Sequence, residues 1–150
     1  MAHGPAHDSH KESDGKLAAK ATLHCLLGCG LGEVGGVIIG VALGLNFFVS
    51  IAIGVFLGFV FGYLLGILPL VKSGFSIGEA SKITFSTETL SIVVMETAEV
   101  LTEIYFPGMM HAGLSDAVFW AGLGSALVMG FAAAYPVNFF LVKRGIRHSH

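Results

Sequence analysis

The sequence predicts an all-α polytopic membrane protein with four transmembrane helices that pack through glycine ladders. Of its 150 residues, 54% are hydrophobic and only 12% are charged, about half the charged fraction of a soluble domain. Apolar runs recur along the chain, and they are long enough to cross a bilayer, which takes about 20 helical residues. Many of the 21 glycines lie in these runs at four-residue spacing, a pattern typical of packed membrane helices.

The chain divides into a polar N-terminal segment, 1–17, and a membrane domain, 18–150. The first segment lacks a hydrophobic period and is predicted to form a flexible cytoplasmic tail. His3, His7 and His10 lie in it. Their spacing is not that of a structural zinc site, so a solvated tail is favoured over weak metal capture.

The first two predicted spans cover about residues 20–45 and 47–71, and only Asn46 separates them. Such a short break predicts a tight helical hairpin. Small residues recur at every fourth position in three of the spans, and in lipid they let helix backbones approach closely. They are Gly28, Gly32, Gly36, Gly40 and Gly44 in the first span, Gly54, Gly58, Gly62 and Gly66 in the second, and Gly122, Ala126, Gly130 and Ala134 in the fourth. We expect these ladders to serve packing and to carry no information about a substrate.

The third predicted span, about 84–106, carries most of the chemistry. Ser76 and Glu79 precede it in a capping-box pattern, which predicts a short surface helix leading into it. At about 100° per residue, its four acids fall within about 80° of arc. A carboxylate in lipid costs roughly 2.5 kcal/mol or more, so this stripe must face protein or water. The acids are Glu88, Glu96, Glu99 and Glu103.

The fourth predicted span, about 116–142, follows a loop that contains His111. We expect His111 to lie at the outer mouth of a pathway and Asp116 to act as an acid at the helix N-terminus. Pro136 predicts a kink near the inner end of the span. Asn138 is expected to satisfy the backbone groups that the kink frees.

The basic residues fix the predicted orientation. All of them precede the first span, lie between the second and third, or follow the fourth. Under the positive-inside rule this places both termini in the cytoplasm and the protein in the cytoplasmic membrane. The eight are Lys11, Lys16, Lys20, Lys72, Lys82, Lys143, Arg144 and Arg147.

The first span also carries candidate metal ligands. On a helix, Cys25 and Cys29 share a face one turn apart, Glu33 lies a further turn along, and His24 is on the flank. Two thiols at this spacing can bind Cu(I) or zinc, whereas they are poor disulfide partners. Glu33 lies in mid-span, where an acid needs a partner.

At 1.5 Å per residue, the ligands of the first and third spans reach similar depths. Thiols, thioethers and imidazole suit soft metals and carboxylates suit hard cations or protons, so the sequence predicts cation binding or translocation, with a transition metal such as copper favoured. The predicted metal set is His24, Cys25, Cys29, Glu33, Met95, Glu96 and Glu99; the predicted pathway or gate is Glu88, Glu103, His111, Asp116 and Asn138.

Four blocks of sequence also point to a known family. They are HCLLGCGLGEVGG (24–36), SIVVME (91–96), FPGMMHAGLSDAVFW (106–120) and YPVNFFLVKRG (135–145). Together they resemble domain-of-unknown-function membrane family 4396, which contains bacterial and archaeal proteins, over about residues 18–150. The resemblance implies a four-helix integral membrane domain, sometimes attached to copper-oxidase-like domains. The family tends to an Asp–Asn pair where this chain has Glu99 and a nearby apolar residue, which leaves the role of Glu99 open.

Two alternative functions stay open at this point. The Cys25–Cys29 pair could make the protein a membrane thiol-redox protein, although redox pairs usually have two intervening residues. A structural or assembly subunit could use the glycine faces, but that function leaves the intramembrane acids unexplained. No nucleotide-binding loop or nucleophile–base pair occurs, so we expect no enzyme. Expected partners are the lipid bilayer, a second copy of the chain and a periplasmic or extracellular metalloprotein; a net charge of −2 argues against nucleic acid.

Overall fold

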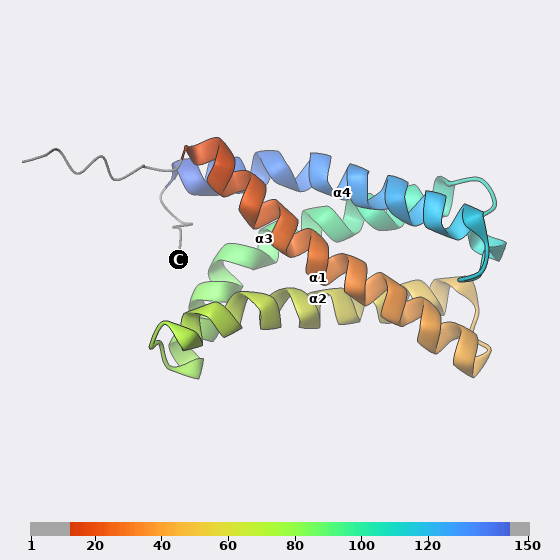
Figure 1. Cartoon of the computed structure of the whole chain (residues 1–150), viewed down its shortest axis with the longest axis horizontal. Helices are drawn as coiled ribbons and strands as arrows, with labels where there is room; N and C mark the ends of the chain where they lie inside the picture. The colour runs from red at the N-terminus through yellow and green to blue at the C-terminus, as the bar shows by residue number, and fades with distance from the viewer. Residues whose placement is uncertain (1–12, 145–150) are drawn as a thin grey trace, which may run out of the picture.

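The computed structural model describes residues 13–144, and its regular elements are all helical. Helices α1 and α3 cross near the middle of the molecule, with α2 along one side and α4 along the other (Figure 1). The start of α1 and the end of α4 lie at the same end of the molecule. The elements are α1 Asp14–Leu43, α2 Phe47–Lys72, α3 Ile77–Tyr105, the 3-10 turn η1 Met109–His111 and α4 Ala117–Lys143. His3, His7 and His10 lie outside the described residues.

Helix α1 begins and ends earlier than the hydrophobic pattern predicts. It begins at Asp14 because the Ser13 side chain caps it by accepting a hydrogen bond from the Lys16 backbone N–H. It ends at Leu43, and Gly44 follows with φ 65°, a left-handed conformation that glycine adopts without strain. Gly44 therefore terminates the helix and does not extend the packing ladder.

Helix α3 is one continuous element, whereas the sequence predicted a separate surface helix before the span. The predicted capping box is present: the Ser76 hydroxyl accepts from the Glu79 backbone N–H, and the Glu79 carboxylate accepts from the Ser76 N–H. The Glu79 carboxylate also accepts a hydrogen bond from the Ser76 hydroxyl, and this bond, with the one from the Ser76 N–H, holds the pKa of Glu79 below its usual value. No residue between this cap and Thr84 stops a helix, so the first turn propagates directly into the acidic stretch.

The glycine ladders pack α1 against α2, as predicted. A Cβ added to Gly28 would lie 2.8 Å from Gly62 Cα, and one added to Gly36 would lie 2.6 Å from Gly54 Cα. Between them, Gly32 lies against Gly58 in the same way. At each of these glycine pairs the backbones of α1 and α2 therefore lie closer together than any larger residue would permit.

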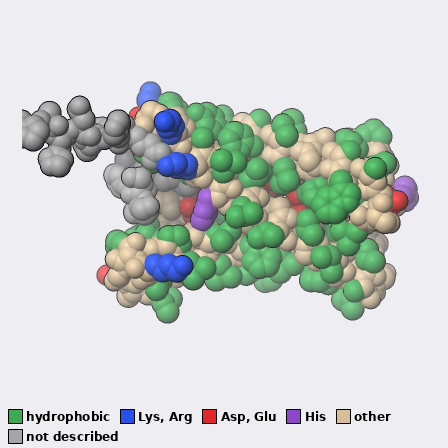
Figure 2. Space-filling model, viewed as in Figure 1, with side chains coloured by type: hydrophobic (Ala, Val, Ile, Leu, Met, Phe, Trp, Pro, Cys, Tyr) green, Lys and Arg blue, Asp and Glu red, His purple; other side chains and the backbone are tan. Residues whose placement is uncertain are grey.

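Three helices, α1, α2 and α4, are long and apolar enough to cross a membrane. Large hydrophobic side chains are exposed along all four helices, and in Figure 2 they cover the middle of the molecule. On this face the Lys and Arg side chains gather at the end where α1 begins. The described basic residues sit at the start of α1 or α3 or at the end of α2 or α4: Lys16, Lys20, Lys72, Lys82, Lys143 and Arg144.

Candidate functional site

The inward face of α3 carries all four of its predicted acids. Glu88, Glu96, Glu99 and Glu103 are buried, while residues on the opposite face, such as Leu90 and Leu101, are exposed. Between the first and last of these acids the helix rises about 22 Å, most of a hydrocarbon core of about 30 Å. Several hydroxyl groups of α3 bond to carbonyls one turn back, as those of Thr89, Thr97 and Thr102 do, and so need no water. The acids thus form a buried file, and the outer face of α3 is compatible with lipid.

The candidate metal site lies in the middle of this file. One ligand atom from each of Cys29, Glu96 and Glu99 lies within 4.8 Å of the other two, and all three residues are buried. This group joins α1 to α3 where the two helices cross. A thiol and two carboxylates in this arrangement could hold a metal ion.

The carboxylate oxygens of this region lack ordinary partners. No side chain or backbone group of the described residues forms a hydrogen bond to either oxygen of Glu33, Glu96 or Glu99. The Cys29 thiol approaches Glu96 and the Glu33 carboxyl approaches Glu99, but neither contact has hydrogen-bond geometry. Burying a carboxylate without compensation is costly. A proton or a cation must therefore compensate these acids.

Two ladder glycines make room for the site, which the sequence did not predict. A Cβ on Gly58 of α2 would meet the Glu96 carboxyl oxygen, and one on Gly130 of α4 would lie 2.6 Å from the oxygen of Glu99. At these two positions the ladders therefore pack against carboxyl groups and not only against backbone. Gly58 and Gly130 follow the same four-residue period as the other ladder glycines. Nothing in the sequence therefore distinguishes them from the glycines that only pack backbone against backbone.

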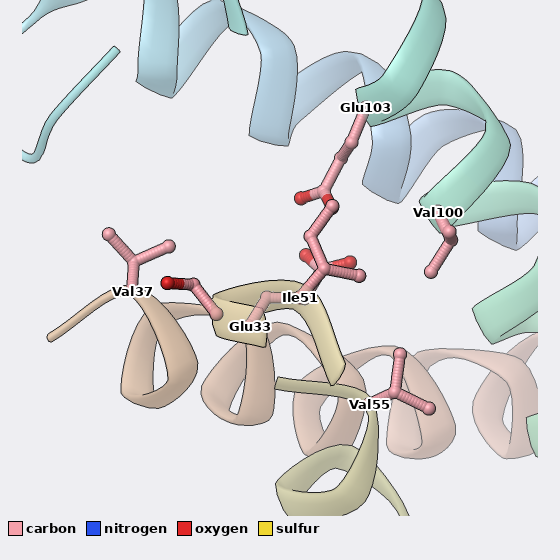
Figure 3. Close-up of a pocket in the computed structure, with 7 residues that line it drawn as sticks. Glu33, Val37, Ile51, Val55, Val100 and Glu103 are labelled. Atoms are coloured by element: carbon pink, nitrogen blue, oxygen red, sulfur yellow. The ribbon is translucent and has the colours of Figure 1, made fainter. Parts of the chain in front are cut away.

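One turn further along, Glu33 and Glu103 line a cavity of about 10 Å³ between α1, α2 and α3. Figure 3 shows Glu103 reaching from α3 toward the α1 side of this cavity, where Glu33 lies. Glu33 is 6% exposed and Glu103 is 5% exposed. The other lining residues are Val37, Ser50, Ile51, Val55 and Val100.

Cys25 is not part of the central group. Its thiol donates a hydrogen bond of 2.9 Å to the Glu88 carboxylate and accepts one of 3.6 Å from the Ser91 hydroxyl. It nevertheless packs in one buried apolar cluster with Cys29 and Met95. Neither Cys25 nor Cys29 forms a disulfide with the other, but their immediate environments differ.

Asn138 connects three helices and does not serve the backbone around Pro136 as expected. Its side-chain amide donates one bond of 2.9 Å to the Thr22 hydroxyl on α1 and another of 2.9 Å to the Ser91 hydroxyl on α3. Helix α4 continues through Pro136 to Lys143. Because the Asn138 side chain points into the bundle, its donors reach the neighbouring helices. Its side-chain carbonyl oxygen is buried and has no hydrogen-bond partner in the part of the chain that the structure describes.

The remaining predicted site residues lie apart from the central group. His24 is half-buried, and its Nε2 atom has no hydrogen-bond partner among the described residues. His111 and Asp116 are exposed in the connection between α3 and α4. The Asp116 carboxylate accepts a 2.7 Å bond from the Gly113 N–H and makes no bond to the first turn of α4, so it orders the loop.

A family model described as a domain of unknown function (DUF4396) matches residues 16–147. The chain belongs to this family, in agreement with the resemblance of its four sequence blocks. No curated protein and no solved structure matches the chain.

Proposed function

We propose that this member of the DUF4396 family is an integral membrane protein with four spans that binds a transition-metal cation at Cys29, Glu96 and Glu99. Its place in a membrane is supported by three helices of spanning length and apolarity. The acids of α3 face inward, which makes α3, the third of the four spans, compatible with lipid. Clustering of the described basic residues at one end supports cytoplasmic termini.

One observation carries the proposed metal site: two uncompensated carboxylates and a thiol converge at the crossing of α1 and α3. Two neighbouring carboxylates cannot both remain charged in an apolar interior without a cation or a proton between them. A bound cation would neutralise the charges of both carboxylates, and the Cys29 thiolate would serve as its third ligand.

The donor set favours a borderline divalent ion. Zinc accepts sulfur, nitrogen and carboxylate oxygen, commonly in a four-coordinate site, whereas Cu(I) is selected by sets of soft ligands. Of the two thiols, only Cys29 joins the central group, because that of Cys25 bonds to Glu88. We therefore place zinc and similar divalent ions ahead of copper, which the sequence favoured.

The acidic file also supports movement of the ion. Glu88, at one end, and Glu103, at the other, extend the central group along α3 toward both ends of the bundle. A protein of this design would bind or translocate a cation and would catalyse no reaction. It would receive the ion from, or deliver it to, a metalloprotein outside the cytoplasm.

The test is metal analysis of the purified full chain in detergent. We expect the wild type to retain or bind zinc and Cys29→Ser to lose at least about 10-fold in affinity, since even outer-shell changes cost 10- to 100-fold. Cys25→Ser is the matched control because it alters a thiol one turn away, outside the group.

Equal affinity in the two variants would refute the site. Absence of binding across a panel of zinc, Cu(I), cobalt and nickel would refute the function. Metal-free protein in which Cys25 and Cys29 oxidise and reduce reversibly would instead support the thiol-redox alternative.

A further inference from the structure

We infer that the cavity between α1, α2 and α3 is a second cation site, built only from oxygen ligands and suited to a hard divalent ion of the Mg²⁺, Ca²⁺ and Mn²⁺ class. Its carboxylates are Glu33 and Glu103. This site shares no ligand with the Cys29 group, although the Glu33 carboxyl also approaches Glu99. The inference goes beyond the proposed function because it needs no metal at the Cys29 group.

The size of the cavity fits one small ligand. Its volume of about 10 Å³ is close to the smallest that holds one water molecule. A bare divalent cation is smaller than water, so the ion itself fits the same space. Because such ions take six or more oxygen ligands, the two carboxylates would hold it together with water. The apolar wall of the cavity includes Val37, Ile51 and Val55, which offer no hydrogen-bond partners. The two carboxylates are therefore the groups that determine what the cavity can bind.

Glu33 supplies an independent observation that points to a ligand. Its side chain is more than nine-tenths buried and lines the cavity, and within residues 13–144 neither of its oxygens has a hydrogen-bond partner. Glu103 faces the same space from α3 (Figure 3). An unpartnered buried carboxylate beside a cavity is the arrangement that a bound cation would complete.

The ligands determine the class of ion. No sulfur or nitrogen side chain lines the cavity, and carboxylate oxygens are the preferred ligands of Mg²⁺, Ca²⁺ and Mn²⁺. Two carboxylates match the charge of a divalent ion. The Ser50 hydroxyl donates to the Asn46 carbonyl and lies against Gly40, so it is not counted among the ligands.

The test adds Mn²⁺ alone to the full chain in lipid nanodiscs and detects the bound ion by electron paramagnetic resonance. We expect bound Mn²⁺ in the wild type and displacement by Ca²⁺. Glu103→Gln and Glu33→Gln should each weaken Mn²⁺ binding by at least about 10-fold. Glu79→Gln removes an exposed acid from the same helix as Glu103 and should leave binding unchanged.

Cys29→Ser separates the two sites. It should weaken zinc binding and leave Mn²⁺ binding within about twofold of the wild type. Zinc binding without Mn²⁺ binding would overturn the second site alone, whereas Mn²⁺ binding without zinc binding would uphold it and refute the proposed function.

Two further outcomes overturn the second site. One is Mn²⁺ binding that survives both Glu33→Gln and Glu103→Gln; the other is equal loss in Cys29→Ser and Glu103→Gln, which would indicate one shared site. Each variant must keep the wild-type elution profile and melting temperature. If Glu33→Gln fails to fold, Glu103→Gln decides the question.

Discussion

Gly130→Ala is the sharpest perturbation of the candidate metal site because it alters no ligand. A Cβ at this position would lie 2.6 Å from Glu99 Oε1, 2.8 Å from its Cγ and 2.9 Å from its Cδ. Since Cβ contacts below 3.0 Å are essentially never seen, the oxygen must retreat by about 0.4 Å. Rotating the carboxyl group alone cannot relieve a clash that includes Cγ. The whole end of the side chain must therefore move.

That displacement is about twice the ±0.2 Å within which metal–ligand distances are held. We expect Gly130→Ala to reduce zinc affinity by at least about 10-fold and to cost about 1–3 kcal/mol of stability through overpacking. Binding would be measured by calorimetry and stability by thermal unfolding, both on the full chain in detergent.

Gly124→Ala is the matched control. It lies on the same helix and is exposed, and a Cβ there would meet no atom within 4 Å. Replacing this glycine should leave affinity unchanged and favour the helix by up to about 1 kcal/mol. If Gly130→Ala binds zinc as tightly as Gly124→Ala, the proposed dependence of the site on this glycine is wrong.

Three further predictions follow from packing and topology. Gly36→Ala should lower the melting temperature far more than Gly35→Ala. The new Cβ at position 36 would lie 2.5 Å from the backbone nitrogen of Gly54, whereas the one at position 35 would meet only a flexible Leu57 methyl group at 3.1 Å. Similar melting temperatures would show that the glycine ladder does not hold α1 against α2. Asn138→Leu should cost about 2 kcal/mol, since two buried bonds at about 1 kcal/mol each are lost, and an unchanged unfolding midpoint would show that the amide links contribute nothing. Reporter fusions at the C-terminus and within 109–115 should report opposite compartments, with the C-terminus cytoplasmic, and a shared compartment would contradict four spans.

Part of the site follows from residue type and period. The stripe of acids on α3 is visible because four carboxylates recur on one helical face, and lipid excludes them from the outside. Cys29 was included among the predicted ligands on the same reasoning about faces. That Cys29 joins the metal group and Cys25 does not was not predictable. Both thiols lie on one face of α1, and only the neighbouring helices give them different partners.

The sequence by itself determined the helices, the packing of the α1–α2 hairpin and the inward direction of the acids. These depend on local quantities: the hydropathy of each run, the four-residue glycine period and the cost of a charge in lipid. The cap that starts α1 at Asp14 and the continuity of α3 depend on local hydrogen bonds that hydropathy does not register.

Only the tertiary structure decided which acids meet. The crossing of α1 and α3 brings Cys29 to Glu96 and Glu99, leaves Glu33 beside a cavity with Glu103, and turns Asn138 toward Thr22 and Ser91. It also gives Gly58 and Gly130 their contacts with carboxyl groups. The period of a single helix specifies a face, but the depth and angle at which two faces meet are set by how all four helices pack together.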